Sequence, residues 1–203
     1  MMIREYSDND ENDWVNCRLL SFLDCSYYDD IRKEKESYEN PSFCYIAVDR
    51  GEVVGLIDVE YEEQEGAVCY FKGGLGAVIW HLGVLPEYRR TGVAKKLWSA
   101  AKNALISKGI ERCEVWTQDD VASNEWYIDQ GFIYKEAYLN AYIKGTEKDE
   151  VIRKFIALDN AGEILGIRCL NFEAPLERKQ ELEQICYRLH EVRVYEQYFS
   201  ENA

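Results

Sequence analysis

The recurrence of apolar residues every three or four positions predicts several helices along the chain. The clearest covers residues 91–108, where valine, leucine and alanine form an apolar stripe, lysines face water, and Gly109 follows as the expected stop. Further helices are expected over residues 12–23, 121–130 and 175–190, and a short, charged, mostly exposed one over residues 29–38. Pro41 breaks the helical pattern, so the chain that follows is interpreted as β-structure.

Runs rich in β-branched and aromatic residues predict strands between these helices. Residues 43–48 and 53–61 flank a turn signal at residues 49–51 and are expected to pair as an antiparallel hairpin. Residues 77–84 are almost entirely apolar, which indicates a central strand. The other expected strands cover residues 3–6, 68–71 (in a second hairpin), 112–117, 132–143, 151–158, 164–172 and 192–199.

This order of elements predicts an α/β (α+β) domain with a smaller extension. Early helices, a hairpin region and a β-α-β-α-β succession give a mixed, mostly antiparallel central sheet flanked by helices over residues 1–158. The pattern then restarts, and residues 159–203 are expected to form a C-terminal β-α-β extension. About 40 residues bury little apolar surface alone. We therefore expect the extension to dock on the core or on a second subunit, as in a homodimer.

Charge narrows the range of partners. The 203 residues include 24 Lys+Arg and 38 Asp+Glu, a formal net charge of −14. An acidic surface repels nucleic acid and anionic lipid, so neither is expected as a partner. No apolar run reaches the roughly 18 residues of a membrane-spanning helix. The charge favours solubility or a cationic substrate.

The cysteines and histidines show no metal-binding or disulfide spacing. Seven cysteines occur without a Cys-x-x-Cys pair, and the only histidines are His81 and His190. We therefore expect no metal. Residues 1–13 lack the basic and apolar parts of a signal peptide, so reduced thiols and a cytoplasmic location are expected.

The segment from residue 79 to residue 97 carries the most chemical information. A buried strand leads into a basic loop with Arg89 and Arg90, and the loop leads directly into the helix at residue 91. The first turn of a helix presents unpaired N–H groups and a positive dipole end, and Gly92 lets an anion approach the backbone closely. These features predict a phosphate or pyrophosphate cradle. The alternative is an ordinary strand–loop–helix corner.

Two motifs in this order resemble a known superfamily. Residues 84–94 read Val-Leu-Pro-Glu-Tyr-Arg-Arg-Thr-Gly-Val-Ala, which is similar to the acetyl-CoA signature Gln/Arg-x-x-Gly-x-Gly/Ala of the GNAT superfamily of N-acetyltransferases. Residues 126–132 read Trp-Tyr-Ile-Asp-Gln-Gly-Phe and resemble the superfamily's aromatic-Tyr-x-x-x-Gly-Phe element. The resemblance covers residues 2–157 and implies acetyl-CoA as the cosubstrate.

The resemblance also implies roles for the matching positions. The backbone of Leu82, Gly83 and Val84 would pair with the pantetheine arm, and Tyr127 would donate a proton to the departing thiolate. Many relatives bind pantetheine through an asparagine where this chain has Asp120, which when ionised accepts but does not donate a hydrogen bond. The pyrophosphate would be held by Arg89, Arg90, Thr91, Gly92, Val93 and Ala94.

Several groups are candidates for the general base. Direct attack on the thioester needs a neutral amine, whose ordinary pKa is about 10.4, so a base must remove its proton. His81 is the only titratable group on the strand before the cradle. Strict alternation places it opposite Trp80, and a β-bulge would switch that phase. The alternative for His81 is a buried structural role, and Asp58, Glu60 and water are rival bases.

The sequence therefore predicts an N-acetyltransferase that transfers the acetyl group of acetyl-CoA to a primary amine. The expected acceptor is a small cationic compound, such as an aminoglycoside-like molecule or a polyamine, although a peptide amino group also fits. Trp80, Tyr138 and Tyr142 are candidates for lining the acceptor pocket. One alternative is a catalytically inactive acyl-CoA-binding module that senses or regulates, and another is a nucleotide-phosphate binder unrelated to CoA.

Overall fold

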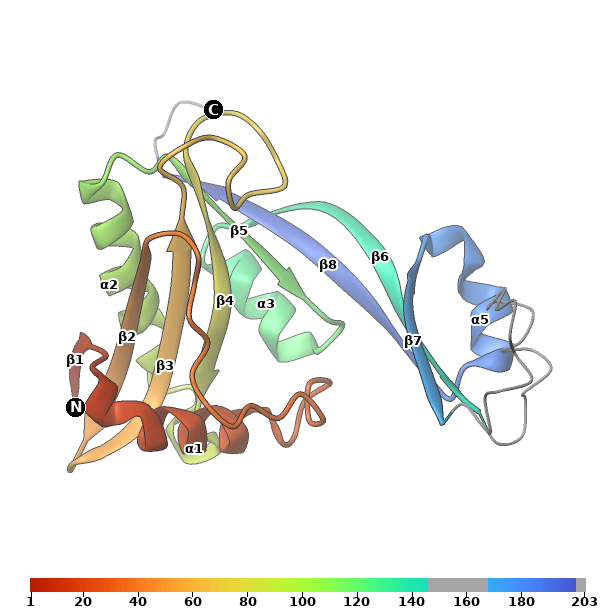
Figure 1. Cartoon of the computed structure of the whole chain (residues 1–203), viewed down its shortest axis with the longest axis horizontal. Coiled ribbons are helices and arrows are strands. Elements are labelled where there is room, and N and C mark those ends of the chain that lie inside the picture. The colour runs from red at the N-terminus through yellow and green to blue at the C-terminus, as the bar shows by residue number, and fades with distance from the viewer. Residues whose placement is uncertain (146–167, 200–203) are drawn as a thin grey trace.

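A single eight-stranded sheet runs through the computed structural model, which describes residues 1–145 and 168–199. The strand order is β1-β2-β3-β4-β5-β8-β6-β7, and only the β4–β5 pair is parallel among the described strands (Figure 1). The strands are β1 (Met2–Glu5), β2 (Ser42–Asp49), β3 (Glu52–Tyr61), β4 (Gly76–Val84), β5 (Arg112–Thr117), β6 (Ile133–Lys144), β7 (Cys169–Ala174) and β8 (Arg188–Tyr198). The mixed, mostly antiparallel sheet expected from the sequence is confirmed.

Helices pack on both faces of this sheet. The four described α-helices are α1 (Glu11–Phe22), α2 (Val93–Ser107), α3 (Val121–Asp129) and α5 (Lys179–Ile185). A Cβ added to Gly55 of β3 would meet Val93 and Leu97 of α2, whereas one added to Gly83 of β4 would meet Ser21 of α1. Gly55 is one residue from the partner of Gly83, so the two point to opposite faces. α1 and α2 therefore cover opposite faces, and none of the described helices has the length and apolar character needed to cross a membrane.

The two parallel strands separate soon after they begin. Residues 76–78 of β4 pair with residues 112–114 of β5, and the remaining edge of β4 has no partner among the described strands. β4 stays paired with β3 along its whole length on the other side. The middle of the sheet therefore opens into a cleft toward the end of β4.

The last strand in sequence lies inside the sheet. β8 pairs with β5 on one side and with β6 on the other. The strand expected near the C-terminus is therefore a central member of the main sheet. The expected boundary at residue 158 and the expected strand at 151–158 lie outside the described residues, and the division into two parts stays a prediction.

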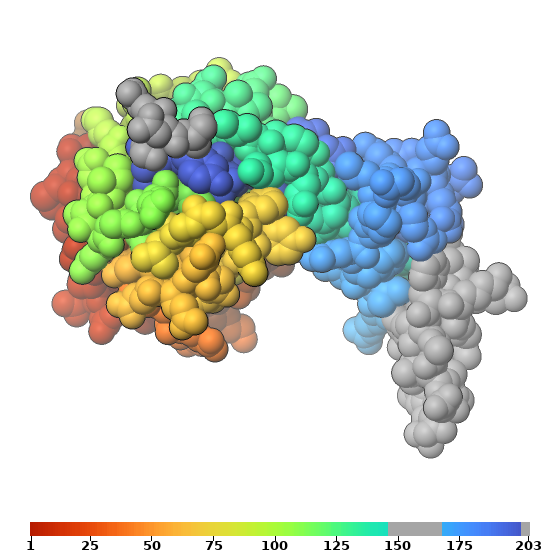
Figure 2. All heavy atoms as spheres, turned by 90° about the horizontal axis from the view of Figure 1, so that it is seen from above, coloured from red at the N-terminus to blue at the C-terminus, as the bar shows by residue number. Residues whose placement is uncertain are grey.

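β6 and β8 continue past the end of β5 and carry β7 and α5 with them. β5 ends at Thr117, opposite Arg193 of β8, so residues 188–192 of β8 pair with β6 alone. We call residues 138–144 and 168–192 the arm. The arm projects from the main body in Figures 1 and 2. Its own small apolar cluster contains Leu139, Ala141, Ala174 and Leu182.

The helix expected over residues 29–38 is not present. Short charged helices are marginal on their own, and here the side chains find partners on the sheet instead. Lys35 pairs with Asp58 of β3, and Glu36 pairs with His81 of β4. Tertiary contacts thus override a weak local preference. We call residues 31–41 the strap.

Two other local predictions are also wrong. Residues 68–71 form no strand, because their N–H groups donate hydrogen bonds to the buried carboxylates of Glu62 and Glu114 rather than to a neighbouring strand. The helix expected over residues 175–190 ends at Ile185. Residues 188–190 belong to β8 instead, since their backbone pairs with β6.

Candidate active site

The corner between β4 and α2 is open at its backbone. Gly92 precedes α2 with a φ of 87°, and no side-chain hydrogen bond caps the helix. A Cβ placed on Gly92 would meet no atom within 4 Å. The first N–H groups of α2 therefore face free space, which is the geometry that binds phosphate at a helix N-terminus. The sequence predicted a phosphate cradle at this corner; the open backbone at Gly92 is compatible with that role, which stays a prediction.

The two arginines of the cradle differ in what they contact. Arg89 donates to both carboxylate oxygens of Asp24, at 2.6 and 2.8 Å, and to the carbonyl of Ser21 at 2.9 Å. The guanidinium of Arg89 holds the pKa of Asp24 below its ordinary value. Arg90 is exposed and makes no ion pair with the described residues. Arg90 is therefore the arginine whose charge is uncompensated, whereas Arg89 fixes the loop. The hydroxyl of Thr91 donates to the carbonyl of Tyr88 at 2.6 Å.

β4 contains a bulge beside the cleft. Asp58 of β3 pairs with His81 and the next residue of β3 pairs with Ile79, which leaves Trp80 as the extra residue. The Trp80 side chain is 49% exposed, and its indole N–H donates to Glu60 at 2.8 Å. Leu82, Gly83 and Val84 follow along the edge of β4 that has no strand partner, where the Val84 carbonyl accepts from Arg89 at 3.3 Å.

His81 is buried and uses both ring nitrogens. Arg18 of α1 donates to Nδ1 at 3.3 Å, and Nε2 lies 2.8 Å from Glu36, so the neutral ring donates from Nε2. The imidazole ring also packs edge-on against the Trp14 ring, with 5.4 Å between the two ring centres. The hydrogen bond from His81 lowers the pKa of Glu36, although burial opposes that shift. This arrangement leaves no free lone pair on His81 for an acceptor amine.

The two acidic rivals for the base are also engaged. Asp58 is fully buried and accepts hydrogen bonds from Trp14 and Tyr38 while pairing with Lys35 at 3.1 Å. Glu60 is buried too, and accepts from the strap through Asn40 as well as from Trp80. Both carboxylates therefore hold the strap onto the sheet.

Tyr127 has the burial and the free hydroxyl expected of a proton donor. Its side chain is 7% exposed, and its hydroxyl makes no hydrogen bond to the described residues. Burial raises the pKa of Tyr127 far above its ordinary value, so the hydroxyl stays protonated at neutral pH. The ring packs against Phe132 and Tyr195, which fixes its orientation.

The start of α3 is fixed by polar contacts. The Asp120 carboxylate accepts from the backbone N–H and hydroxyl of Ser26. Asn124 donates to the carbonyls of Gln118 and Asp120 and accepts from Tyr195 at 2.8 Å. Neither side chain has a free donor for a ligand. Any contact of Asp120 with a pantetheine amide would use its remaining acceptor capacity or its main chain.

These elements surround one cleft of about 2050 Å³. It extends from the Gly92 corner, along the open edge of β4 and past Tyr127, to the strap and Trp80. All the site residues expected from the sequence except Thr91 line it: His81, Leu82, Gly83, Val84, Arg89, Arg90, Gly92, Val93, Ala94, Asp120 and Tyr127. Residues from three separate parts of the sequence are thus brought to one cavity.

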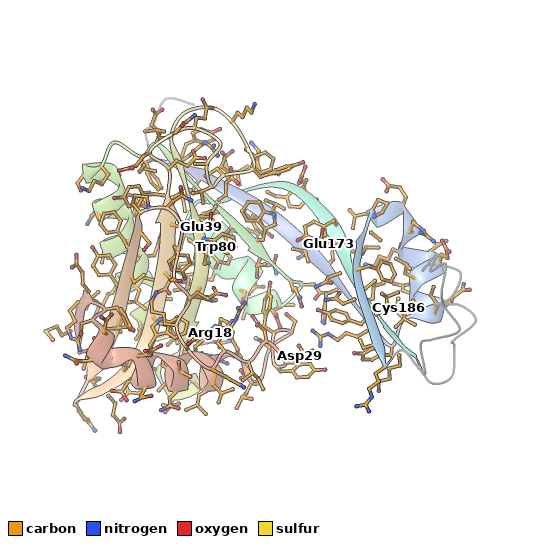
Figure 3. All side chains as sticks on the ribbon, in the orientation of Figure 1. Arg18, Asp29, Glu39, Trp80, Glu173 and Cys186 are labelled. Atoms are coloured by element: carbon orange, nitrogen blue, oxygen red, sulfur yellow. The ribbon has the colours of Figure 1, made fainter. Side chains whose placement is uncertain are left out.

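Of the residues proposed from the sequence to line an acceptor pocket, Trp80 and Tyr138 do line the cleft, but the sequence did not reveal several others near them. Arg18, labelled in Figure 3, was not singled out. Its guanidinium pairs with the Asp30 carboxylate at 2.7 Å and donates to His81 at 3.3 Å. Glu36 was assigned to an exposed helix, but it lines the cleft, as does Glu39 just after that segment. The only available signal was the density of charge over residues 29–38, and this pattern equally fits a solvated surface.

Comparison with known proteins agrees with this geometry. Residues 7–132 match the family model of the Acetyltransferase (GNAT) family. The N-alpha-acetyltransferase 30 of Schizosaccharomyces pombe is 28% identical over 109 residues, which are 53% of this chain and 68% of that protein. An acetyltransferase of Sodalis glossinidius is 31% identical over 107 residues, which are 53% of this chain and 66% of that protein.

A solved structure shows the same fold over nearly the whole chain. The ribosomal-protein-S18-alanine N-acetyltransferase of Escherichia coli superposes with a TM-score of 0.58 at 10% identity, covering 100% of this chain and 97% of that one. The chain therefore belongs to the GNAT acetyltransferase family. Its activity is that of an acetyl-CoA-dependent acetyltransferase, and the resemblance seen in the two sequence motifs is confirmed.

Proposed function

We propose that the chain transfers the acetyl group of acetyl-CoA to the primary amine of a small cationic acceptor within this cleft. The observation that carries the proposal is the open main-chain corner at Gly92, continuous with the unpaired edge of β4 and with the Tyr127 hydroxyl. In this assignment the first N–H groups of α2, with Arg90, hold the pyrophosphate. The main chain of Leu82, Gly83 and Val84 pairs with the pantetheine arm.

The cosubstrate supplies an activated acetyl thioester, and the chain supplies position and charge stabilisation. A main-chain N–H on the free edge of β4 stabilises the oxyanion that forms when the amine attacks. Tyr127 then donates its proton to the sulfur as the carbon–sulfur bond breaks, which leaves the free thiol and the amide. Holding both reactants in one cleft removes much of the entropic barrier.

We propose that water, rather than His81, takes the proton from the acceptor amine. Both nitrogens of His81 are committed to Arg18 and Glu36, and Asp58 has no exposure. His81 in this proposal positions the strap through Glu36. A His81→Gln variant should therefore keep the pH dependence of kcat/KM of the wild type, while loss of the acidic limb of that profile would assign the base to His81.

The acceptor side combines an aromatic surface with carboxylates. Trp80 is half exposed with its N–H fixed, and no aromatic or cationic side chain among the described residues stacks on it. Tyr138 lines the cleft from the arm, and burial together with the neighbouring Glu173 raises its pKa to about 12. Glu39 lines the cleft as Trp80 does, and Figure 3 shows both on the main body and Glu173 on the arm. A cation is attracted both to an indole face and to carboxylates.

The test is release of free thiol from acetyl-CoA across a panel of amines, run on the wild type and on Trp80→Leu. We expect turnover with diamines or polyamines. Their KM should rise about twofold to 30-fold in Trp80→Leu, which corresponds to the loss of one cation–π contact of about 0.5–2 kcal/mol. The KM for acetyl-CoA should not change. Acetyl-CoA binding without turnover of any amine would favour the inactive sensor. Turnover of neutral peptide amines alone would exclude a cationic acceptor.

A further inference from the structure

The short segment between α1 and the strap connects several parts of the cleft. We call residues 24–30 the bridge. Asp24 of the bridge holds Arg89 of the cradle at 2.6 Å. Ser26 donates to Asp120 at the start of α3, and the Tyr27 hydroxyl accepts from the backbone of Gln118 at 3.0 Å. The bridge therefore touches both the phosphate-binding corner and the helix that carries Tyr127.

The arm holds the bridge from the other side, through Arg188. This side chain is 10% exposed and donates to the Asp29 carboxylate at 2.6 Å and to the Ser26 carbonyl at 3.0 Å. Its third nitrogen donates to His190 at 3.0 Å. The Asp29 label in Figure 3 lies between the main body and the arm. One guanidinium from β8 thus fixes two points of the bridge.

Aromatic rings hold the guanidinium in place. Its central carbon lies 4.1 Å from the ring centre of Tyr142 on β6 and 4.9 Å from that of Tyr28 on the bridge. His190 in turn contacts Asp119 at 2.8 Å, just before α3. A planar, stacked and hydrogen-bonded arginine is not replaceable by lysine without loss of contacts. This is a built junction rather than a single surface ion pair, which would have little effect.

We propose that Arg188 is a positioning residue through which the arm holds the bridge, and with it the acetyl-CoA corner, in the binding-competent arrangement. The inference rests on the proposed assignment of acetyl-CoA to the Gly92 corner. Without Arg188 the bridge samples more conformations, and binding must then order it again. The affinity for acetyl-CoA therefore falls, although Arg188 does not line the cleft.

The experiment measures acetyl-CoA binding to the full-length chain by calorimetry. Arg188→Met and Asp29→Asn break the junction from its two sides, and Arg193→Met is the matched control on the same strand. Arg193 pairs with Glu191 at 2.9 Å and does not contact the bridge. We expect the dissociation constant to rise about fivefold or more in the first two variants, as for a typical coupling between sites. It should change less than twofold in the control. The dissociation constant of Arg188→Lys should lie between that of Arg188→Met and that of the control.

A double variant separates positioning from general destabilisation. Asp24→Asn releases the bridge from Arg89. Adding Arg188→Met to Asp24→Asn should therefore raise the dissociation constant by a smaller factor than Arg188→Met does in the wild type. Additive effects of the two substitutions on the dissociation constant would overturn the inference, as would unchanged affinity in Arg188→Met and Asp29→Asn. Changes of equal size in kcat and in the KM values of both substrates would also overturn it. Failure of the wild type to bind acetyl-CoA would instead overturn the proposed function on which the inference rests.

Discussion

At the scale of single residues, the glycines at the two ends of α2 allow the proposed phosphate site to be tested. Gly92 and Gly109 flank α2 with φ values of 87° and 78°, and neither has an atom within 4 Å of an added Cβ. Valine at either position costs a similar amount of stability, on the order of 1–3 kcal/mol, because φ is positive. Only Gly92 lies at the cradle.

We predict that Gly92→Val weakens acetyl-CoA binding at least tenfold, about 1.4 kcal/mol, whereas Gly109→Val leaves it unchanged. Calorimetry with acetyl-CoA, alongside thermal unfolding of both variants, checks this. Equal affinity in the two variants would show that the main-chain corner does not hold the pyrophosphate.

Tyr127 and its neighbour Tyr195 allow a matched comparison of catalysis and stability. We predict that Tyr127→Phe lowers kcat by about 10²- to 10⁴-fold, the usual contribution of a proton donor. Its stability should hardly change, because the hydroxyl has no described partner. Tyr195→Phe removes a hydrogen bond to Asn124, and should lower stability by about 1 kcal/mol with little effect on kcat. The measurements are steady-state kinetics and denaturant unfolding.

At the scale of elements, the bridge and strap are attached to the sheet largely through ionised carboxylates. Hydrogen bonds from Arg89, Arg188 and His81 lower the pKa values of Asp24, Asp29 and Glu36 respectively. A group with a lowered native pKa stabilises the fold above its ordinary pKa, here 3.8 or 4.5. That contribution disappears as the pH falls through the native value.

We therefore predict that acid releases residues 24–36 before the sheet unfolds. In a series of pepsin digestions at successively lower pH below 3.8, the ordinary aspartate pKa, this segment should be cleaved first while the far-UV spectrum remains native. The variant Asp24→Asn/Asp29→Asn/Glu36→Gln should already expose the segment to a neutral protease at pH 7. Loss of the sheet and of the segment at one and the same pH would contradict the prediction.

At the scale of the whole molecule, the position of β8 makes the C-terminal part indispensable. β8 lies between β5 and β6 and buries Val194 and Tyr195. Removing the residues after Asp159 removes both β7 and β8, so β6 loses both of its described partners, β5 loses one, and apolar surface is exposed.

We predict that this truncation aggregates or unfolds. Size-exclusion chromatography and calorimetric unfolding of the truncated and full-length chains check this. A monomeric truncation with unchanged unfolding would mean that the C-terminal part is an independent addition.

The predictability of the site differs between its two halves. The acetyl-CoA half was predictable because a strand, a basic loop and a helix start are contiguous in sequence, and the corner at Gly92 is made by that local order. The acceptor half was not. Asp58 and Glu60 looked like free acids, but their partners Lys35, Tyr38 and Asn40 lie about 20 residues away.

By itself the sequence determined most of the strands and helices, the family and the open corner at Gly92. Periodicity, glycine positions and charge act over a few residues, and these features depend on local geometry. Only the tertiary structure decided that β8 enters the middle of the sheet, that residues 29–38 lie along the sheet as a strap, and that Arg188 reaches the bridge. Such pairings form between residues as many as 162 positions apart. They depend on which surfaces meet after folding, and the short-range pattern of residues along the sequence does not predict this.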